Sequence, residues 1–546
     1  MDAVLEANLM RRLCVGDILK RTALNKPNQE AIVYYYGGEV RGRVTYAELD
    51  RRANRFANAL LEMGVKKGDR VAILSYNCIQ YAVFIAALAK MGAWITPLNY
   101  ALKAREIQPL IRHAGPVMFV AEDDMVATVR EIETELPSVR HFVMIDLNGR
   151  TALPAGWLDF DELCSDRHSG EEPAVAITGD DVLTLMYTSG TEAMPKGVMN
   201  SHANWHASIM NMALDFGPII LPDDTGLGVV PLFHVAGHIA LLTAYAYGTR
   251  MAMLHRPDPP VVMKVFETGE ITSANISPTV MANIVNMPGG EDLIRRLFGT
   301  LRWVNLYGSP TTEAMMRKIM GLLPKAYFQN YYGQSEVTPL GTTLKSPDML
   351  RKMKEASERF GGAEAIGQSH AMVEMKVVDG DDREVPPGTM GEMAVRSPSV
   401  MLGYYKEEQK TRETFRNGWH HTGDLAVMDE ERYYYFMDRK KDMIKTGAEN
   451  VSSVEVEGWV AKHPKVAECA VVGLFHARWV EAVTAFVVPA AGQKVDEAEI
   501  LGHCREGLAG YKCPKKVVVL EALPKLPSGK ILKRDLKRDY RDIYGQ

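Results

Sequence analysis

The feature that most restricts the fold of this chain is the alternation of short apolar segments with amphipathic ones. Over residues 45–64, apolar side chains recur every three or four positions, and this spacing predicts a helix. Residues 70–74 and 93–97 are predicted to be short buried strands, with a second helix over residues 80–91 between them. Because this order is typical of parallel sheets covered by helices, we expect an α/β fold.

The length of 546 residues predicts about three to four domain-sized units. A charged run at residues 438–442 precedes a tail that has the length of one domain. We therefore expect a large N-terminal domain of parallel-rich sheets at residues 1–440 and a small α+β domain at residues 441–546. Within the tail, strands are predicted at residues 466–475, 485–488 and 516–520, and a helix at 497–508.

Composition and charge argue against several classes of protein. The 63 basic and 68 acidic residues leave a net charge of −5, so no overall field attracts nucleic acid. The six cysteines lie far apart without a CxxC pair, which disfavours a zinc site and a disulfide scaffold. No apolar run has the length of a membrane-spanning helix, and the N-terminus lacks the apolar stretch of a signal peptide. We therefore expect no transmembrane segment and a cytoplasmic location.

Residues 187–198, YTSGTEAMPKGV, have the composition of a phosphate-binding loop. Small and hydroxylated residues let backbone N–H groups and side-chain oxygens surround phosphate, and Lys196 adds a positive charge. The segment differs from the GxxxxGKS/T loop because Gly197, and not a serine or threonine, follows Lys196. Taken alone, the segment is equally compatible with a flexible polar turn.

Further motifs follow this segment in a fixed order. They are PLFHVAG at residues 231–237, YYGQSE at 331–336, GWHHTGD at 418–424, DRKKD at 438–442, GAEN at 447–450 and PSGK at 527–530. Together with the loop, and over nearly the whole chain, they resemble the motifs of the adenylate-forming superfamily, in its branch of AMP-forming acyl-CoA synthetases. The loop departs from the family pattern TSGTTGxPKG at Glu192 and Ala193.

The resemblance implies an enzyme with two half-reactions. A carboxylic acid would react with ATP to give acyl-AMP and pyrophosphate, and CoA would then take the acyl group and release AMP. The expected cofactors are ATP, Mg²⁺ and CoA as co-substrate, and the expected partner is a small-molecule carboxylic acid. The small domain is expected to swing about Lys441 between the two half-reactions. A homodimer is compatible with the sequence.

The same resemblance implies a set of site residues. The predicted ATP- and AMP-binding residues are Thr188, Ser189, Gly190, Thr191, Lys196, Tyr332, Gly333, Ser335, Asp424 and Arg439. The predicted metal ligands are Glu336 and Thr188, and the predicted catalytic residues are Lys530, His234, Glu336 and Lys441. The predicted acid pocket comprises His234, Val235, Gly308, Ser309, Tyr331 and Gly333. The predicted CoA-binding residues are Lys445, Gly447, Ala448 and Glu449.

For three of these residues the sequence also allows a purely structural role. Lys530 belongs to a basic tail that water would solvate, and His234 lies among apolar residues, where a histidine is more often part of a core. Asp424 follows a glycine, where aspartate commonly caps a turn. The ordered motifs favour the functional roles. By resemblance, Lys530 contacts the carboxylate and the α-phosphate, Asp424 holds the ribose hydroxyls, and His234 lies beside the acid.

The nature of the acid is predicted from the residues around these motifs. PLFHVAG contains no aspartate to pair with a substrate ammonium, which disfavours amino acids. Tyr331, Met210 and Met212 predict an apolar, adaptable pocket for a medium-chain, branched, alicyclic or aryl acid. The alternatives are a long-chain fatty acyl-CoA synthetase, an acyl-AMP ligase that loads a carrier protein and, in a different class, a catalytically silent adenylate-binding regulator. The regulator hypothesis rests on departures from the family pattern at Glu192, Ala193, Ala448 and Leu526.

Overall fold

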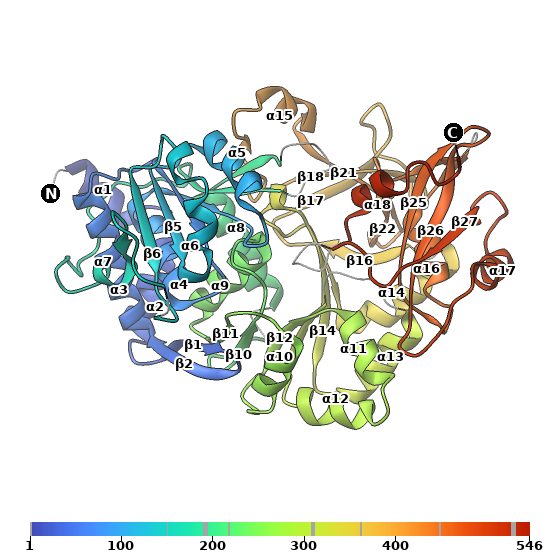
Figure 1. Ribbon diagram of the computed structural model, residues 1–546, viewed down its shortest axis with the longest axis horizontal. Helices are drawn as coiled ribbons and strands as arrows, with labels where there is room; N and C mark the ends of the chain where they lie inside the picture. Colours follow the sequence, from blue (N-terminus) through green and yellow to red (C-terminus); the bar gives the residue numbers. More distant parts are fainter. Residues whose placement is uncertain are drawn as a thin grey trace.

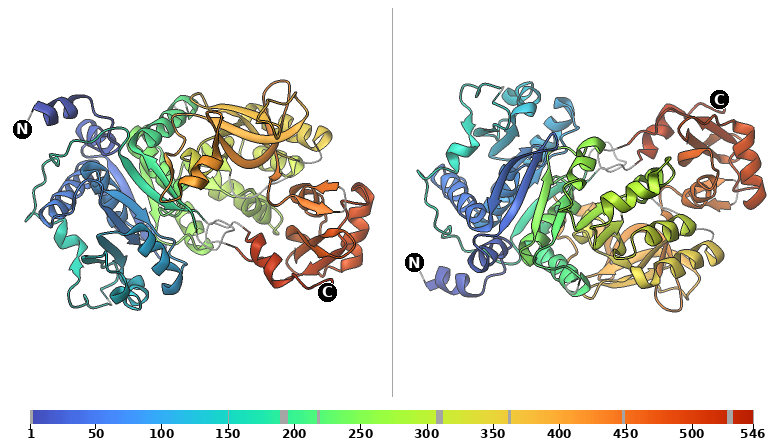
Figure 2. Two further views of the ribbon diagram at one scale, coloured as in Figure 1. Left: turned by 90° about the horizontal axis from the view of Figure 1, so that it is seen from above. Right: turned by 90° about the horizontal axis from the view of Figure 1, so that it is seen from below.

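The computed structural model describes residues 3–149, 151–188, 195–216, 219–306, 312–360, 363–446, 449–525 and 531–545. Within these residues the strands form three sheets, and the C-terminal one lies at the opposite end of the longest axis from the first (Figure 1). The two ends of the chain lie at opposite ends of the molecule (Figure 2). None of the helices in these ranges is both long enough and apolar enough to cross a membrane.

The first sheet is the predicted parallel sheet of the N-terminal part. Its strand order is β19-β9-β8-β4-β3-β5-β6-β7, and the strands from β8 to β7 in this order run parallel. The bounds are β3 Arg70–Leu74, β4 Trp94–Pro97, β5 Met118–Glu122, β6 His141–Ile145, β7 Leu158–Asp159, β8 Val182–Tyr187, β9 Gly197–Ser201 and β19 Gly403–Tyr404. The short apolar runs become buried strands because helices cover both faces of the sheet.

The helices that were predicted from local spacing form with nearly the predicted bounds. Helix α3 begins where the Thr45 side chain accepts a hydrogen bond from the Glu48 amide, and α4 ends at Gly92, which takes a φ of +72°. Helices α2, α3, α4, α8 and α9 share one core with both larger sheets, and α5 and α6 pack on the other face of the first sheet. The bounds are α1 Ala3–Arg11, α2 Gly16–Asn25, α3 Tyr46–Glu62, α4 Ile79–Met91, α5 Ala104–Ala114, α6 Val126–Arg130, α7 Phe160–Leu163, α8 His202–Phe216 and α9 Val235–Tyr247.

The second sheet combines a parallel half with an antiparallel half. Its main path is β17-β18-β21-β22-β16-β15-β14-β13-β12-β10-β11-β1-β2, and β20 pairs with β21. Strands β14, β13, β12, β10, β11 and β1 run parallel, whereas β15 and the strands beyond it pair antiparallel. The bounds are β1 Glu30–Tyr36, β2 Glu39–Thr45, β10 Thr225–Gly228, β11 Arg250–Leu254, β12 Ser273–Ile276, β13 Trp303–Leu306, β14 Tyr327–Tyr332, β15 Thr342–Lys345, β16 Glu364–Ser369, β17 Glu374–Val378, β18 Met390–Arg396, β20 Phe415–Arg416, β21 Trp419–Met428 and β22 Tyr434–Arg439.

A further group of helices packs against this second sheet. Residues of α10 to α14 join those of β10 to β14 in one apolar core. The bounds are α10 Pro259–Phe266, α11 Pro278–Val285, α12 Gly290–Phe298, α13 Glu313–Leu322, α14 Ser346–Arg359 and α15 Glu408–Thr414. Three short 3-10 helices are η1 Asp123–Met125, η2 Glu133–Glu135 and η3 Ser335–Val337.

The third sheet belongs to the C-terminal part and has the order β24-β23-β26-β25, with β27 paired to β26. The boundary predicted at residues 440 and 441 falls in the turn between β22 and β23. Across it, the Asp438 carboxylate accepts hydrogen bonds from the Ser453 amide and hydroxyl at 2.6 and 2.8 Å. The bounds are β23 Ile444–Thr446, β24 Glu449–Val451, β25 Val466–His476, β26 Val480–Pro489, β27 Lys516–Val519, α16 Ser453–Val460, α17 Glu497–Gly507 and α18 Lys533–Asp539.

Candidate active site

A cavity of about 1280 Å³ is lined by residues of both larger sheets, of α9 and of the start of the C-terminal part. Most of the described residues predicted for the site line it. These are Thr188, Lys196, His234, Val235, Tyr331, Tyr332, Gly333, Ser335, Glu336, Asp424, Arg439 and Lys441. The tertiary structure thus brings together side chains that come from four separate sequence motifs and from the loop.

At one end of the cavity, the Asp424 carboxylate is held by one ion pair and two hydrogen bonds. Strands β21 and β22 pair with Asp424 opposite Arg439, and the Arg439 Nε lies 3.3 Å from Asp424 Oδ1. Asp424 Oδ2 accepts hydrogen bonds from the Tyr332 hydroxyl at 2.7 Å and from Gln334 Nε2 at 2.6 Å. Asp424 is 2% exposed, so these contacts replace its hydration almost completely.

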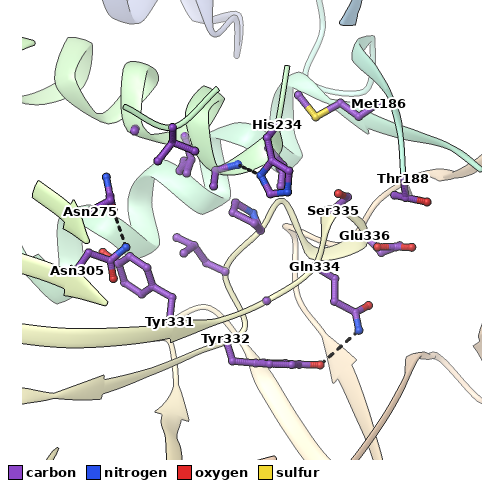
Figure 3. A pocket seen from close by; sticks show the side chains of 18 of the residues that line it. Met186, Thr188, His234, Asn275, Asn305, Tyr331, Tyr332, Gln334, Ser335 and Glu336 are labelled. Atoms are coloured by element: carbon purple, nitrogen blue, oxygen red, sulfur yellow. Dashed lines mark hydrogen bonds between the residues drawn. The ribbon is translucent and has the colours of Figure 1, made fainter. Parts of the chain in front are cut away.

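The pKa values of these groups follow from the shared burial. Burial is the largest single influence and lowers the pKa of Arg439, but Asp424 and the other acidic groups around it together outweigh burial and raise that pKa above its usual value. Burial, followed by the charge of Asp424, raises the pKa of Tyr332 well above its usual value. The Tyr332 hydroxyl therefore stays protonated and donates to the carboxylate. The side chains of Tyr332 and Gln334 lie next to each other beside the turn that follows β14 (Figure 3).

The turn after β14 requires glycine at position 333. A Cβ on Gly333 would lie 1.3 Å from the carbonyl oxygen of Pro339, a distance that no side chain can adopt. The turn is also fixed from outside, because Asn200 Nδ2 donates to the Ser335 carbonyl at 3.3 Å. Glu336 Oε1 accepts a hydrogen bond from the Tyr404 hydroxyl at 2.9 Å. The contact of Gly333 with the Pro339 carbonyl therefore fixes the turn that carries Tyr332 before Gly333 and Glu336 after it.

The predicted phosphate loop joins two antiparallel strands and does not lead directly into a helix. Tyr187 of β8 pairs with Gly197 of β9, and the Thr188 amide donates to the Lys196 carbonyl at 3.0 Å. Lys196 Nζ lies 5.0 Å from the centre of the Tyr404 ring. Thr188 and Glu336 lie at the same end of the cavity (Figure 3). Ser189, Gly190 and Thr191, together with Glu192 and Ala193, lie outside the described residues.

Lys440 and Lys441, from the turn between β22 and β23, and Arg534 also line this end. Desolvation, followed by the charge of Arg439, lowers the pKa of Lys441. Lys440 Nζ lies 3.0 Å from Glu392 Oε2, and Arg534 of α18 also lines the cavity. Lys530 and Leu526 lie outside the described residues, in a segment whose ends are joined by a β-bridge between Lys525 and Ile531.

The other end of the cavity is formed by α8, α9 and the parallel half of the second sheet. His234 caps α9, since its Nδ1 accepts from the Ala236 amide at 3.2 Å, and its side chain is exposed toward the cavity. The Tyr331 hydroxyl donates to Met212 Sδ at 3.4 Å and accepts from Gln329 Nε2 at 2.6 Å. The pocket residues Gly308 and Ser309 lie outside the described residues. Tyr331 and Met212 thus line this end as predicted, whereas Met210, the third residue of that prediction, is 48% exposed and does not line the cavity.

The described residues predicted to bind CoA do not line the cavity. Lys445 lies in β23 and its amide donates to Glu481 Oε2 at 2.7 Å, while Glu449 begins β24. Both side chains are exposed. Gly447 and Ala448 lie between these strands and outside the described residues. The CoA role of this hairpin stays a prediction.

Four residues that the structure places in the site were given no role from the sequence. Gln334 lies inside a predicted motif, and its contact with Asp424 depends on how the turn meets β21. Tyr404 contacts Glu336 from a strand 68 positions further along the chain. Asn275 and Asn305 lie at the apolar end, and no motif marks them. Contacts of this kind leave no local pattern in a sequence.

Comparisons with known proteins agree with this geometry. A family model described as AMP-binding enzyme matches residues 19–405, and one described as AMP-binding enzyme C-terminal domain matches residues 455–530. Feruloyl-CoA synthase of Amycolatopsis sp is 33% identical over 539 residues, which cover 97% of this chain and 100% of that protein. The long-chain-fatty-acid–CoA ligase FadD13 of Mycobacterium tuberculosis H37Rv is 31% identical, over 96% of this chain and 98% of its own. The crystal structure of ATP-bound MatB from Rhodopseudomonas palustris aligns with a TM-score of 0.83 at 26% identity, over 97% of this chain and 99% of that one.

Proposed function

Because this chain belongs to the AMP-binding enzyme family and is an ATP-dependent carboxylate–CoA ligase, we propose that its acid is a medium-chain, branched, alicyclic or aryl carboxylate. The observation that carries the proposal is the continuity of the cavity. It runs from Asp424 and Arg439 at one end to Val235, Met212 and Tyr331 at the other. One molecule of acid and one nucleotide can therefore meet within a single cavity.

In the first half-reaction, an oxygen of the acid attacks the α-phosphorus of ATP, and the bond from that phosphorus to the pyrophosphate oxygen breaks. Both reactants are anions, so the site needs positive charge where they meet. Lys196, Arg439 and Lys441 line this end of the cavity and supply it. Lys530 is proposed to join them, and Arg534, four residues further along the chain, already lines the cavity.

Asp424 is proposed to hold the ribose. A carboxylate offers about four acceptor positions on its two oxygens. In the structure Tyr332 and Gln334 both donate to Oδ2, and Arg439 forms an ion pair with Oδ1. A ribose hydroxyl can therefore bind Oδ1 without rearrangement, whereas one that binds Oδ2 requires one of its two donors to move away. Gln334 is the candidate for this movement, because its Nε2 also donates to the Thr422 carbonyl at 3.0 Å and would keep that partner.

The chemistry of the residues at this end fits Mg²⁺. Glu336 supplies one carboxylate and Thr188 one hydroxyl oxygen, and Mg²⁺ is usually held by one or two carboxylates together with phosphate oxygens and water. When bound, the ion would neutralise part of the charge on the leaving pyrophosphate. The Tyr404 hydroxyl orients the carboxylate by donating to Glu336 Oε1.

In the second half-reaction, the thiolate of CoA attacks the carbonyl carbon of acyl-AMP, and the bond from that carbon to the phosphate oxygen breaks as AMP leaves. Residues 447–450 are proposed to line the CoA path. Lys445 and Glu449 lie away from the cavity in the structure, so the small domain must turn about Lys441 to bring them in. The turn from residue 440 to 443 lies between β22 and β23, where such a rotation disturbs neither sheet.

The test is a panel of carboxylic acids, including a chain-length series, assayed for AMP release and for thioester formation with and without CoA. We expect acid-dependent AMP release that CoA accelerates, with aryl, branched, alicyclic or medium-chain acids preferred over acetate. Glu336→Gln should abolish it. The matched control is Glu384→Gln, because Glu384 is a surface acid that pairs with Arg432.

The alternatives give different results in the same assay. A preference that rises to the longest chains indicates a long-chain synthetase. Acyl-AMP formation without any thioester of CoA indicates transfer to a carrier protein. Nucleotide binding without pyrophosphate exchange for any acid indicates a silent regulator and contradicts the ligase assignment.

A further inference from the structure

One residue of the C-terminal part reaches the cavity without an assigned role. Among the described residues that follow Lys441, only Arg534 lines the cavity. It lies in α18, which packs on β25 on the side of the third sheet that faces the rest of the molecule (Figure 2). Its side chain is 45% exposed, so its guanidinium is accessible to a ligand. A guanidinium stays protonated in proteins and offers five N–H donors, so Arg534 brings a permanent positive charge to the nucleotide end.

Helix α18 is oriented by the residues on either side of Arg534. The Leu536 side chain is buried in the apolar core between α18 and the third sheet. Lys533 Nζ donates to Ser453 Oγ at 2.6 Å and lies 2.7 Å from Glu457 Oε1. Residues three apart share a helix face. Lys533 and Leu536 therefore attach one face of α18 to the small domain, whereas Arg534 projects from another face.

The same contacts continue across the boundary between the two parts of the chain. Ser453, to which Lys533 donates, in turn donates from its amide and its hydroxyl to Asp438 Oδ2 at 2.6 and 2.8 Å. Ser453 and Asp438 are both buried, so water does not compete for these hydrogen bonds. Asp438 belongs to β22, which precedes the proposed pivot at Lys441. This series of contacts therefore holds Arg534 at the cavity in the arrangement that the structure shows.

The charges at this end indicate what Arg534 can bind. The positive charge of Arg439 is offset by Asp424 at 3.3 Å, and that of Lys440 by Glu392 at 3.0 Å. The triphosphate of ATP and the carboxylate of the acid are both anions, and negative charge collects on pyrophosphate as it leaves. A planar guanidinium can donate to two phosphate oxygens at once. Arg534 therefore suits the phosphate groups of ATP.

The rotation about Lys441 restricts Arg534 to one half-reaction. Strand β23 pairs with β26, β26 pairs with β25, and α18 packs on β25, so the β23–β24 hairpin and Arg534 belong to one packed unit. In the structure Arg534 lines the cavity, whereas Lys445 and Glu449 of the hairpin do not. A rotation that brings the hairpin into the cavity therefore moves Arg534 away from it.

We propose that Arg534 is a catalytic residue of the first half-reaction, which binds the phosphate groups of ATP through its guanidinium and leaves the cavity before CoA attacks. This inference rests on the proposed function and adds a second cation of the small domain to the one proposed at Lys530. Arg534 exchanges no atoms with the substrates and acts through its charge. Lys533 and Ser453 are positioning residues, because they orient α18 and do not line the cavity.

The test measures the two half-reactions separately in Arg534→Gln, with the best acid of the panel. Acyl-AMP formation is followed by ATP–pyrophosphate exchange, and thioester formation by adding acyl-AMP and CoA. The kcat/KM for ATP should fall by at least about tenfold, the effect of losing one hydrogen bond to a charged group, while the KM for the acid stays unchanged. Thioester formation from added acyl-AMP should persist, which also shows that the variant is folded.

Two further variants connect the loss to the position and to the charge. Arg538→Gln is the matched control, because Arg538 lies one turn further along α18, pairs with Asp535 at 3.0 Å and does not line the cavity. It should retain both half-reactions. Arg534→Lys keeps a positive charge but loses the planar group, and it should recover part of the activity that Arg534→Gln loses.

Three outcomes overturn the inference and leave the proposed function intact. The first is an equal loss in both half-reactions, which indicates a structural role. The second is a loss no larger than that of Arg538→Gln. The third is a loss that Arg534→Lys does not reduce, because charge is then not its cause. Absence of acyl-AMP formation by the wild-type protein with every acid contradicts the proposed function, and the inference with it.

Discussion

The substitution Gly333→Ala tests whether the turn after β14 sets the geometry of the nucleotide end. The added Cβ would lie 1.3 Å from the Pro339 oxygen and 2.5 Å from its carbonyl carbon, whereas ordinary contact begins at 3.4 Å. One of the two backbone segments must therefore move by about 2 Å. Overpacking of this kind costs about 1–3 kcal/mol of folding free energy. Because Tyr332 adjoins the site of the clash, its hydroxyl should be displaced from Asp424.

The assay is ATP–pyrophosphate exchange with the best acid of the panel, together with the melting temperature. A displacement of about 1 Å in an active site lowers catalysis by about 100-fold, so we expect at least that loss of kcat/KM at a temperature where the variant is still folded. The matched control is Gly321→Ala in α13, where no atom lies within 4 Å of the new Cβ. Gly321→Ala should keep full activity and be neutral or stabilising by up to about 1 kcal/mol. Exchange by Gly333→Ala within threefold of wild type would refute the reasoning.

Four further predictions concern the small domain and the core. Lys530→Ala should lower the rate of acyl-AMP formation by at least about 100-fold, because one charge contact in the transition state is lost. Thioester formation from added acyl-AMP should persist. Equal losses in both half-reactions would contradict this role of Lys530. Lys441→Pro should leave acyl-AMP formation intact and slow thioester formation, because proline fixes φ near −65° and removes the freedom of a hinge. Unchanged overall turnover would place the pivot elsewhere. Val480 is exposed and has a φ of +69°, which valine adopts only with strain. Val480→Gly should therefore raise the free energy of unfolding by about 1 kcal/mol in chemical denaturation. An unchanged free energy of unfolding would show that the strain is absent. Burial, followed by the charge of His421, lowers the pKa of His420 to about 3, so the stability that neutral His420 contributes is complete above about pH 6.5 and is lost as the pH falls toward 3. His420→Leu should therefore make the melting temperature less dependent on pH over that interval. An unchanged pH dependence would assign the loss of stability to other groups.

Local patterns in the sequence were sufficient for helices α3, α4 and α17 and for the identity of the motifs. The limits of α3 follow from apolar spacing and from the Thr45 cap, and those of α4 from its apolar run and from Gly92. Each of these signals involves residues within about four positions of one another, which a sequence records directly. Strands β25, β26 and β27 of the C-terminal sheet were predicted in the same way, although β26 begins at Val480, before the predicted segment 485–488, and β23 and β24 were not predicted.

Which strands pair, and in which direction, was decided by the tertiary structure. An α/β fold with parallel-rich sheets was expected, and that class is confirmed, but the antiparallel half beyond β14 has no counterpart in the predicted alternation. The predicted phosphate loop likewise joins β8 to an antiparallel strand, β9, and α8 begins only after it. Strand pairing depends on the fit of whole surfaces, so single segments do not specify it.

The site shows the same division between sequence and structure. Its motif residues were recognisable from the sequence, although Ser189, Gly190, Thr191, Gly308, Ser309, Gly447, Ala448 and Lys530 lie outside the described residues and stay predictions. The Asp424 contact with Tyr332 joins residues 92 positions apart, and the amide of Asn305 meets that of Asn275 across 30 positions. Such contacts exist only after the register of the sheet is set. The sequence by itself therefore determined the chemical groups that this protein can use. The tertiary structure decided which of these groups face each other, because hydrogen bonds and burial depend on distances in space that no local pattern encodes.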